Sequence, residues 1–228
     1  MIRSALVSAI LAAVLAVLPV CPATPPASAA ASVLAYPGMP ILQGETRCTL
    51  AFIDTIRRIG YSAGHCNTSS EVRDEHGRPL GIVSVWQHNR AGKLTTGVED
   101  AVIDYEAISI NPGVEVTNLL GPAFTRPLIT QPGVTPTPGM VVCQRGTTTG
   151  SSCGVIDAVH DGWFTMRAGG MTSEHGDSGA PVYTYTDETG STPVIVGILR
   201  GLNGGRAAAV SWPDTLRHAI YDAAAATS

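Results

Sequence analysis

Residues 173–181 read SEHGDSGAP, and they place Ser178 between an aspartate and a glycine, with a second glycine at position 176. Glycine and aspartate are ordinary turn residues, so this stretch predicts a tight polar loop. A serine hydroxyl is a useful nucleophile only when a neighbouring base takes its proton. The loop therefore suggests a nucleophilic serine, provided that the rest of the chain supplies a histidine and a carboxylate.

Candidates for both partners lie earlier in the chain. His65 follows an apolar stretch in the sequence SAGHC, and an imidazole exchanges protons near neutral pH. Asp104 lies in the apolar run AVIDYEAI, where an unpaired carboxylate would be costly to bury. Asp100 also precedes an apolar run and is the alternative acid. We predict that Asp104 orients His65 and that His65 activates Ser178.

The glycine before the serine suggests a second function for the loop. Nucleophilic attack on a carbonyl puts negative charge on its oxygen, and losing one backbone N–H donor to that oxygen costs roughly 3–4 kcal/mol in other enzymes. The backbone amides of Gly176 and Ser178 are the candidate donors, because Gly176 has no side chain to obstruct the oxygen. We expect Asp177 to anchor the loop by ion pairing, with Arg145 as a candidate partner.

The composition limits the class of protein. The chain has 228 residues, of which 44% are apolar, so it can bury a large core in one domain or two small ones. Its formal net charge is −4. Phosphate binding needs a basic surface, so the charge argues against nucleic acid as a partner.

The N-terminus has the composition of a secretory signal peptide. Arg3 precedes an apolar stretch over residues 5–20, and a segment rich in Pro, Ala and Ser follows. We predict cleavage at residues 27–29, with residues 29–31 as the alternative. A transmembrane anchor is the other reading, but the stretch is short of the ~20 residues that a spanning helix needs.

The predicted organisation is a signal peptide at residues 1–29 and one mature domain at residues 30–228. No later segment of the chain is apolar over a membrane-spanning length. We therefore expect a secreted monomer, either extracellular or associated with the cell envelope, without a stable membrane anchor.

Four cysteines remain in the predicted mature domain: Cys48, Cys66, Cys143 and Cys153. An even number in an oxidising compartment predicts two disulfides. Three pairings exist, of which nearest-neighbour pairing closes two short loops. A zinc site is the alternative, but the chain has no Cys-x-x-Cys pair, and we expect neither a metal nor a cofactor.

Short strands separated by turn residues account for most of the predicted domain. They are predicted at residues 49–53, 80–86, 101–110, 140–144, 154–159, 163–167, 181–185, 193–199 and 207–212. Such a series predicts an all-β barrel or sandwich. A helix is predicted at the C-terminus, where Ser211 can cap it and Pro213 suits its first turn. The proline-rich residues 119–138 lack periodicity and predict a connection between two halves of the body.

Four motifs resemble those of chymotrypsin-fold serine endopeptidases, and the secreted bacterial streptogrisin-like branch is the most similar. SAGHC is similar to the histidine motif of that family, and GDSG at residues 176–179 matches its nucleophile motif. RCTLAF at residues 47–52 resembles the strand that carries the first cysteine. VCQRGTTTG at residues 142–150, closing at Cys153, resembles the second disulfide hairpin. The resemblance spans residues 36–224.

The resemblance implies two six-stranded antiparallel β-barrels, as in trypsin, with the active site between them and residues 119–138 at their junction. It implies a serine endopeptidase that hydrolyses peptide bonds through an acyl-enzyme. His65, Asp104 and Ser178 would be the base, the orienting acid and the nucleophile. The backbone amides of Gly176 and Ser178 would form the oxyanion hole.

Substrate recognition departs from the pattern of the family. Arg200 and Leu202 fall near positions that usually hold small residues, and the disulfide that borders the specificity pocket of many relatives is missing from the sequence. With His175 and Arg206 they are the candidate substrate-binding residues, and the arginines could attract an acidic side chain of a protein or peptide. The alternatives are a catalytically idle binding module of the same fold and an esterase with the same mechanism.

Overall fold

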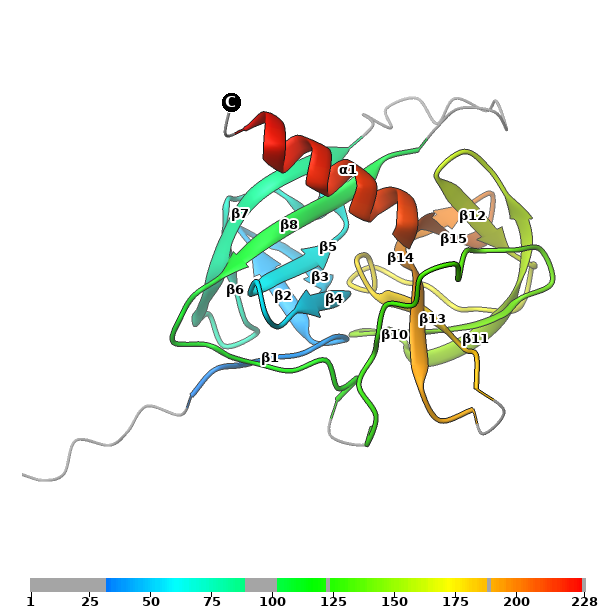
Figure 1. Cartoon of the computed structure of the whole chain (residues 1–228), viewed down its shortest axis with the longest axis horizontal. Helices are drawn as coiled ribbons and strands as arrows, with labels where there is room; N and C mark the ends of the chain where they lie inside the picture. Colours follow the sequence, from blue (N-terminus) through cyan, green and yellow to red (C-terminus); the bar gives the residue numbers. More distant parts are fainter. Residues whose placement is uncertain (1–31, 89–101, 122–123, 188–189, 227–228) are drawn as a thin grey trace, which may run out of the picture. The chain divides into compact units, whose positions relative to one another are not determined.

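The computed structural model of the chain describes residues 32–88, 102–121, 124–187 and 190–226. The predicted signal peptide and the alternative acid Asp100 lie outside the described residues. Within residues 32–228, the N-terminal half forms one antiparallel sheet and the C-terminal half forms a barrel (Figure 1).

Seven strands make up the N-terminal sheet, in the spatial order β3–β2–β6–β7–β8–β5–β4. Their bounds are β2 Pro40–Gln43, β3 Thr46–Thr49, β4 Phe52–Asp54, β5 Ile59–Ser62, β6 Glu71–Arg73, β7 Pro79–His88 and β8 Asp104–Ile110. A short 3-10 helix, η1 (Gly64–Cys66), follows β5. The edge strands β3 and β4 are separated only by Leu50 and Ala51, so the sheet curls until its two edges meet at one chain segment.

This junction between the edge strands shows that the predicted single strand at residues 49–53 is wrong. The amide of Leu50 donates to Met39 O, next to β2, whereas the amide of Ala51 donates to Tyr61 O on β5. The chain therefore changes pairing partner between two consecutive residues. An apolar run of this kind does not reveal such a change, because both flanking segments are buried.

Six strands close the C-terminal barrel, in the spatial order β10–β11–β12–β15–β14–β13. Their bounds are β10 Val141–Gly146, β11 Gly150–Val159, β12 Trp163–Met166, β13 Pro181–Tyr185, β14 Pro193–Asn203 and β15 Arg206–Ser211. Residues 119–138 lie between β9 (Glu115–Val116), which pairs in parallel with β1 (Leu34–Ala35), and β10. The predicted fold class, an all-β double barrel of the trypsin type with a C-terminal helix, is confirmed, although the N-terminal half is a curled seven-stranded sheet.

The C-terminal helix α1 (Trp212–Ala225) continues directly from the barrel strand β15 and packs on the N-terminal sheet (Figure 1). The Trp212 ring lies 5.0 Å from the Phe52 ring and 5.1 Å from the Tyr61 ring, measured between centroids. Ser211 occupies the predicted N-cap position, but its side chain makes no capping hydrogen bond. The helix therefore joins the two halves through aromatic packing and through Asp222, which accepts hydrogen bonds from Gln87 and Tyr105 of the sheet.

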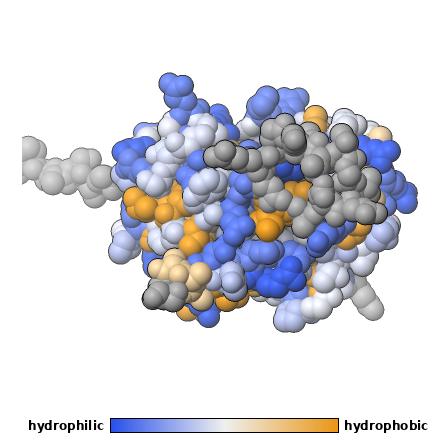
Figure 2. All heavy atoms as spheres, turned by 90° about the horizontal axis from the view of Figure 1, so that it is seen from above, coloured by the Kyte–Doolittle hydropathy of each residue, from blue (hydrophilic) through white to orange (hydrophobic). Residues whose placement is uncertain are grey.

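The surface of the domain is mixed in character. Figure 2 shows apolar patches separated by polar residues on the face that it presents. Within the described residues, the structure has no helix that is both long and apolar enough to cross a membrane.

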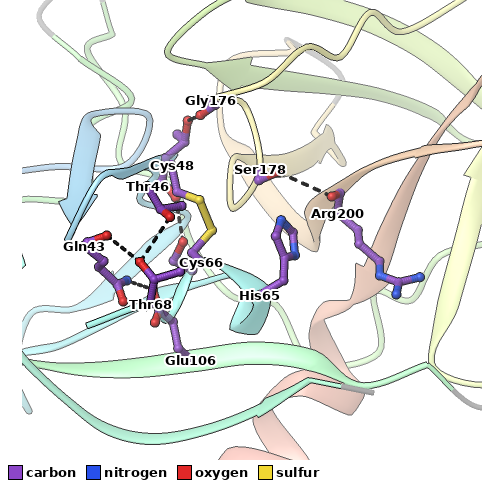
Figure 3. The surroundings of a disulfide bond; sticks show 12 residues. Gln43, Thr46, Cys48, His65, Cys66, Thr68, Glu106, Gly176, Ser178 and Arg200 are labelled. Carbon is purple, nitrogen blue, oxygen red and sulfur yellow. Dashed lines mark hydrogen bonds between the residues drawn. A yellow bond between two sulfur atoms is a disulfide. The ribbon is translucent and has the colours of Figure 1, made fainter. Parts of the chain in front are cut away.

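One acidic side chain lies inside the N-terminal half. Glu106 on β8 is fully buried, and Gln43 Nε2 donates a 2.5 Å hydrogen bond to its Oε1 (Figure 3). Glu106 Oε2 has no partner within the described residues. Burial, aided by the nearby negative charge of Asp104, raises the pKa of Glu106 from an ordinary 4.5 to about 8. Glu106 is therefore protonated at neutral pH in the folded protein.

This burial predicts how stability depends on pH. Above pH 4.5 the unfolded chain loses the Glu106 proton while the folded protein keeps it, so unfolding becomes easier as pH rises toward 8. The Glu106→Gln variant lacks this effect. In urea titrations, the free energy of unfolding of the variant minus that of wild type should therefore increase by on the order of 3 kcal/mol between pH 4.5 and pH 7.5.

The control for this experiment is Glu115→Gln, which removes an exposed glutamate from β9. Its free energy of unfolding should stay within about 0.5 kcal/mol of wild type. A Glu106→Gln variant whose advantage over wild type is the same at both pH values would contradict the assignment of a buried, protonated Glu106.

Candidate active site

The structure brings His65 of η1 against Asp104, the first residue of β8. His65 Nδ1 lies 2.8 Å from Asp104 Oδ2, and the backbone amide of His65 donates a 2.8 Å hydrogen bond to Asp104 Oδ1. An ionised carboxylate can only accept hydrogen bonds, so Nδ1 carries the imidazole proton and Nε2 is left as the acceptor. Asp104 thus sets both the orientation and the tautomer of His65.

The Asp104 carboxylate is charged although its side chain is fully buried. Burial alone would raise its pKa, but the hydrogen bonds from His65 and the cation of Arg200 outweigh burial, and the pKa of Asp104 is lowered. Arg200 Nε lies 3.1 Å from Asp104 Oδ2, the same oxygen that faces His65 Nδ1. His88, at the end of β7, lies beside this group, and burial lowers the pKa of His88.

Ser178 lies in the loop between β12 and β13, next to His65 (Figure 3). Its hydroxyl donates a long hydrogen bond of 3.4 Å to the backbone carbonyl of Arg200. Within the described part of the chain, the structure has no hydrogen bond between Ser178 Oγ and His65.

The backbone around Ser178 is held against the N-terminal sheet. The Thr49 amide donates a 2.8 Å hydrogen bond to Ser178 O. Gly179 has a φ of +86°, and a Cβ at this position would lie 2.2 Å from Ser62 Oγ and 2.3 Å from Thr49 O. Only glycine fits this close approach, which fixes the loop across the boundary between the two halves.

The two predicted donor amides are left without acceptors. Neighbouring amides are occupied: Asp177 N donates to Glu174 O, and Gly179 N donates to Leu199 O. Among the residues that the structure describes, no acceptor faces the backbone amide of Gly176 or that of Ser178. Gly176 is buried and Ser178 is half-buried, and backbone amides usually have a partner in the protein or in ordered water, so both N–H groups are available to an external acceptor.

Three consecutive threonines in the turn between β10 and β11 hold this loop, and the sequence analysis did not single them out. Thr148 Oγ1 donates a 2.7 Å hydrogen bond to His175 O, and Thr147 Oγ1 donates a 3.0 Å bond to Gly176 O. The carbonyl and N–H of a peptide point in opposite directions. By fixing His175 O, Thr148 therefore fixes the direction of the Gly176 N–H. The only signal in the sequence is the Thr-Thr-Thr run within the hairpin motif.

Asp177 anchors the loop in a different way from the one predicted. Its fully buried carboxylate accepts the backbone amides of Thr148 and Thr149 at 2.8 and 3.0 Å through Oδ1, and the amide of Glu174 at 3.0 Å through Oδ2. The expected ion pair with Arg145 is wrong, because the Arg145 guanidinium lies over the Phe124 ring.

Both disulfides follow the nearest-neighbour pairing. Cys48 is bonded to Cys66, directly after His65, and Cys143 is bonded to Cys153 across the β10–β11 hairpin. The first bond ties η1 to β3 (Figure 3). The second lies in the hairpin whose turn holds residues 175–177. Each disulfide thus supports one side of the candidate site.

The candidate substrate-binding residues lie in different surroundings. His175 is exposed beside Gly176, and Leu202 is 58% exposed. Leu202 lines a cavity of about 260 Å³ together with His65, His88 and Arg200. Arg206 lies away from this cavity's lining and pairs with Asp157 at 2.5 Å.

Solved structures share this architecture. The fold is similar to that of a glutamic acid-specific serine protease that uses a histidine triad in substrate binding, with a TM-score of 0.61, 20% identity, and coverage of 82% of this chain and 98% of that one. It is similar to Thermobifida fusca Protease A, with a TM-score of 0.60, 23% identity and coverage of 82% and 97%. A scabies mite inactivated protease paralogue, S-I1, also matches, with a TM-score of 0.51, 14% identity and coverage of 81% and 92%. The chain therefore has the chymotrypsin fold of serine proteases.

Sequence relatives are more similar but carry no assigned activity. The chain is 40% identical over 191 residues to the uncharacterized protein Rv1815 of Mycobacterium tuberculosis strain H37Rv. These aligned residues cover 83% of this chain and 84% of that protein. The uncharacterized protein MT1863 of strain CDC 1551 matches at the same identity and coverage. The chain belongs to one family with these mycobacterial proteins. No family model matches it.

The contacts of Asp177 predict a large effect of a small substitution. In Asp177→Asn, one carboxylate oxygen becomes an NH₂ group that must face a backbone N–H. We expect the free energy of unfolding to fall by about 1–3 kcal/mol in urea titrations, and hydrogen exchange at the amides of Thr148, Thr149 and Glu174 to accelerate. The control is Asp157→Asn, which removes a half-exposed carboxylate paired with Arg206 and should cost less than about 1 kcal/mol. Equal losses in both variants would contradict the anchoring role of Asp177.

Proposed function

We propose that this protein is a secreted serine endopeptidase that hydrolyses peptide bonds through an acyl-enzyme on Ser178. The observation that carries the proposal is the arrangement of His65 on the buried Asp104, beside Ser178 and beside two amides that lack acceptors. The chymotrypsin fold supports the proposal, since proteases of this fold use the same three residue types.

The mechanism follows from the tautomer of His65. With its Nδ1 proton held by Asp104, His65 Nε2 takes the proton of the Ser178 hydroxyl as Oγ attacks the substrate carbonyl carbon. The imidazolium then protonates the leaving amine, and the acyl group stays on Ser178. A water molecule then attacks the acyl carbon and gives a proton to His65 Nε2. The imidazolium returns this proton to Ser178 Oγ as the ester bond breaks and the carboxylic acid leaves.

The developing oxyanion would accept hydrogen bonds from the amides of Gly176 and Ser178. Support comes from the contacts that hold these two peptides in place: Thr148 Oγ1 donates to His175 O, and the Ala180 amide donates to Asp177 O at 2.9 Å. Because the donors are already oriented before substrate arrives, little reorganisation is needed when the charge forms.

Substrate side chains would meet His175, Leu202 and the cavity that His65, His88 and Arg200 line. The expectation that Arg200 and Arg206 attract an acidic side chain receives little support, since each already pairs with a carboxylate of the chain. We propose an apolar contribution from Leu202, which is 58% exposed.

We further propose that residues 1–29 form a signal peptide and that residues 30–228 form the exported domain, with residues 119–138 joining its two halves. The two disulfides are consistent with an oxidising, extracellular location. We expect the exported domain to act as a monomer on proteins or peptides.

Covalent labelling tests the proposed nucleophile. A fluorophosphonate probe should label the oxidised mature protein at Ser178, as located by peptide mass spectrometry. Labelling should be lost in Ser178→Ala and reduced at least 100-fold in His65→Ala, because the hydroxyl then lacks its base. Ser151→Ala, which removes an exposed serine of β11, should label as wild type does. Failure of the folded wild-type protein to label at any pH would contradict the proposal.

A binding module without turnover is the second candidate. Two observations favour it: the Ser178 hydroxyl faces Arg200 O, and an inactivated protease paralogue shares the fold. Digestion of a peptide library separates the two. New peptide termini produced by wild type and lost in Ser178→Ala support the peptidase, whereas retention of uncleaved peptides by both proteins supports the module.

A further inference from the structure

Arg200 of β14 occupies an unusual position, because its cation reaches the carboxylate that holds His65. Its side chain is 14% exposed, and its Nε lies 3.1 Å from Asp104 Oδ2. The same oxygen faces His65 Nδ1 at 2.8 Å. We propose that Arg200 is a positioning residue that shares the Asp104 carboxylate with His65 and opposes protonation of the imidazole during the reaction.

The proposed role of Arg200 follows from the charges at the site. Asp104 and Arg200 neutralise one another while His65 is uncharged, so the resting group carries no net charge. Transfer of the serine proton to His65 adds a positive charge close to a permanent guanidinium cation. With an uncharged residue at position 200, the same transfer would instead neutralise the negative Asp104. Arg200 therefore makes the imidazolium harder to form.

The neighbouring titratable groups do not compensate for this added charge. His88 of β7 faces the same site, with its ring centroid 5.8 Å from that of His65, and contributes no negative charge. Glu106, two residues along β8, is protonated at neutral pH. Asp222 of α1 already accepts hydrogen bonds from Tyr105 and Gln87. Within the described residues, Asp104 is thus the carboxylate available to the imidazolium, and Arg200 shares it.

Arg200 contacts the site through two different groups, its backbone carbonyl and its side-chain cation. Its backbone carbonyl accepts the Ser178 hydroxyl (Figure 3), and its side-chain Nε lies 3.1 Å from Asp104 Oδ2. One residue therefore contacts both the proposed nucleophile and the proposed orienting acid. A protein with this arrangement should keep its base unprotonated further into acid solution than one with a neutral residue at position 200.

The kinetic test rests on the proposed function. The pH profile of kcat/KM is measured for wild type, for the neutral variants Arg200→Gln and Arg200→Ser, and for the charged variant Arg200→Lys. The midpoint of the rise of kcat/KM on the acidic side, the acid limb, should move to higher pH by about one unit in either neutral variant. In Arg200→Lys it should move by less than about 0.3 unit. Arg217→Gln is the matched control, because Arg217 pairs with Asp214 on α1, and its profile should not move.

A loss of activity without movement of the acid limb in either folded neutral variant would overturn the proposal, since a purely structural role predicts that result. An equal movement in Arg200→Lys would also overturn it, because the effect would then not depend on charge.

A second measurement needs no turnover. The His65 imidazole is titrated by NMR in Ser178→Ala and in Ser178→Ala combined with Arg200→Gln or Arg200→Ser. The titration midpoint should be higher by about one pH unit without the arginine. If this movement is found while wild type cleaves no peptide, the inference stands and the proposed function fails. If wild type cleaves peptides and the midpoint does not move, the inference is overturned and the proposed function stands.

Discussion

The buried carboxylate of Asp104 is the interaction on which the candidate site depends. It holds the backbone of His65 through Oδ1 and faces the His65 side chain through Oδ2, so one residue of β8 sets both the position and the tautomer of the imidazole. A buried charge of this kind is tolerated only with partners. Here the partners come from both halves of the domain, because Arg200 lies on the barrel strand β14. The ion pair therefore also joins the two halves at the site.

Other contacts across the same boundary position the serine relative to the histidine. The Thr49 amide binds Ser178 O, Gly179 approaches Ser62 and Thr49 too closely for any side chain, and α1 carries Trp212 from the barrel onto the N-terminal sheet. The threonine turn of the β10–β11 hairpin then orients the peptide on the other side of Ser178. The loop is thus held by several short contacts at once, none of which involves an arginine partner for Asp177.

The sequence predicts the parts of this arrangement that depend on local patterns. The all-β class, the C-terminal helix and the presence of two disulfides follow from strand-like runs, helix-start residues and an even number of cysteines, whereas the structure decides among the three pairings. The short strands β2, β5 and β6 were missed, and residues 49–53 were joined into one strand, because pairing partners distant in sequence decide where such strands end. The Arg200–Asp104 pair and the backbone partners of Asp177 also join distant segments, and no pattern in one sequence reveals them. The convergence of His65, Asp104 and Ser178 is predicted from the chemistry of the three residue types and from the motif resemblance together.

The most direct measurement of the central claim is proton NMR of the His65 Nδ1 hydrogen at neutral pH. An Nδ1 proton held by the buried Asp104 carboxylate should give a strongly deshielded resonance, protected from exchange with water, and this resonance should disappear in Asp104→Ala. If wild type instead has its neutral imidazole proton on Nε2, with no protected Nδ1 resonance, the geometry described for this site is contradicted.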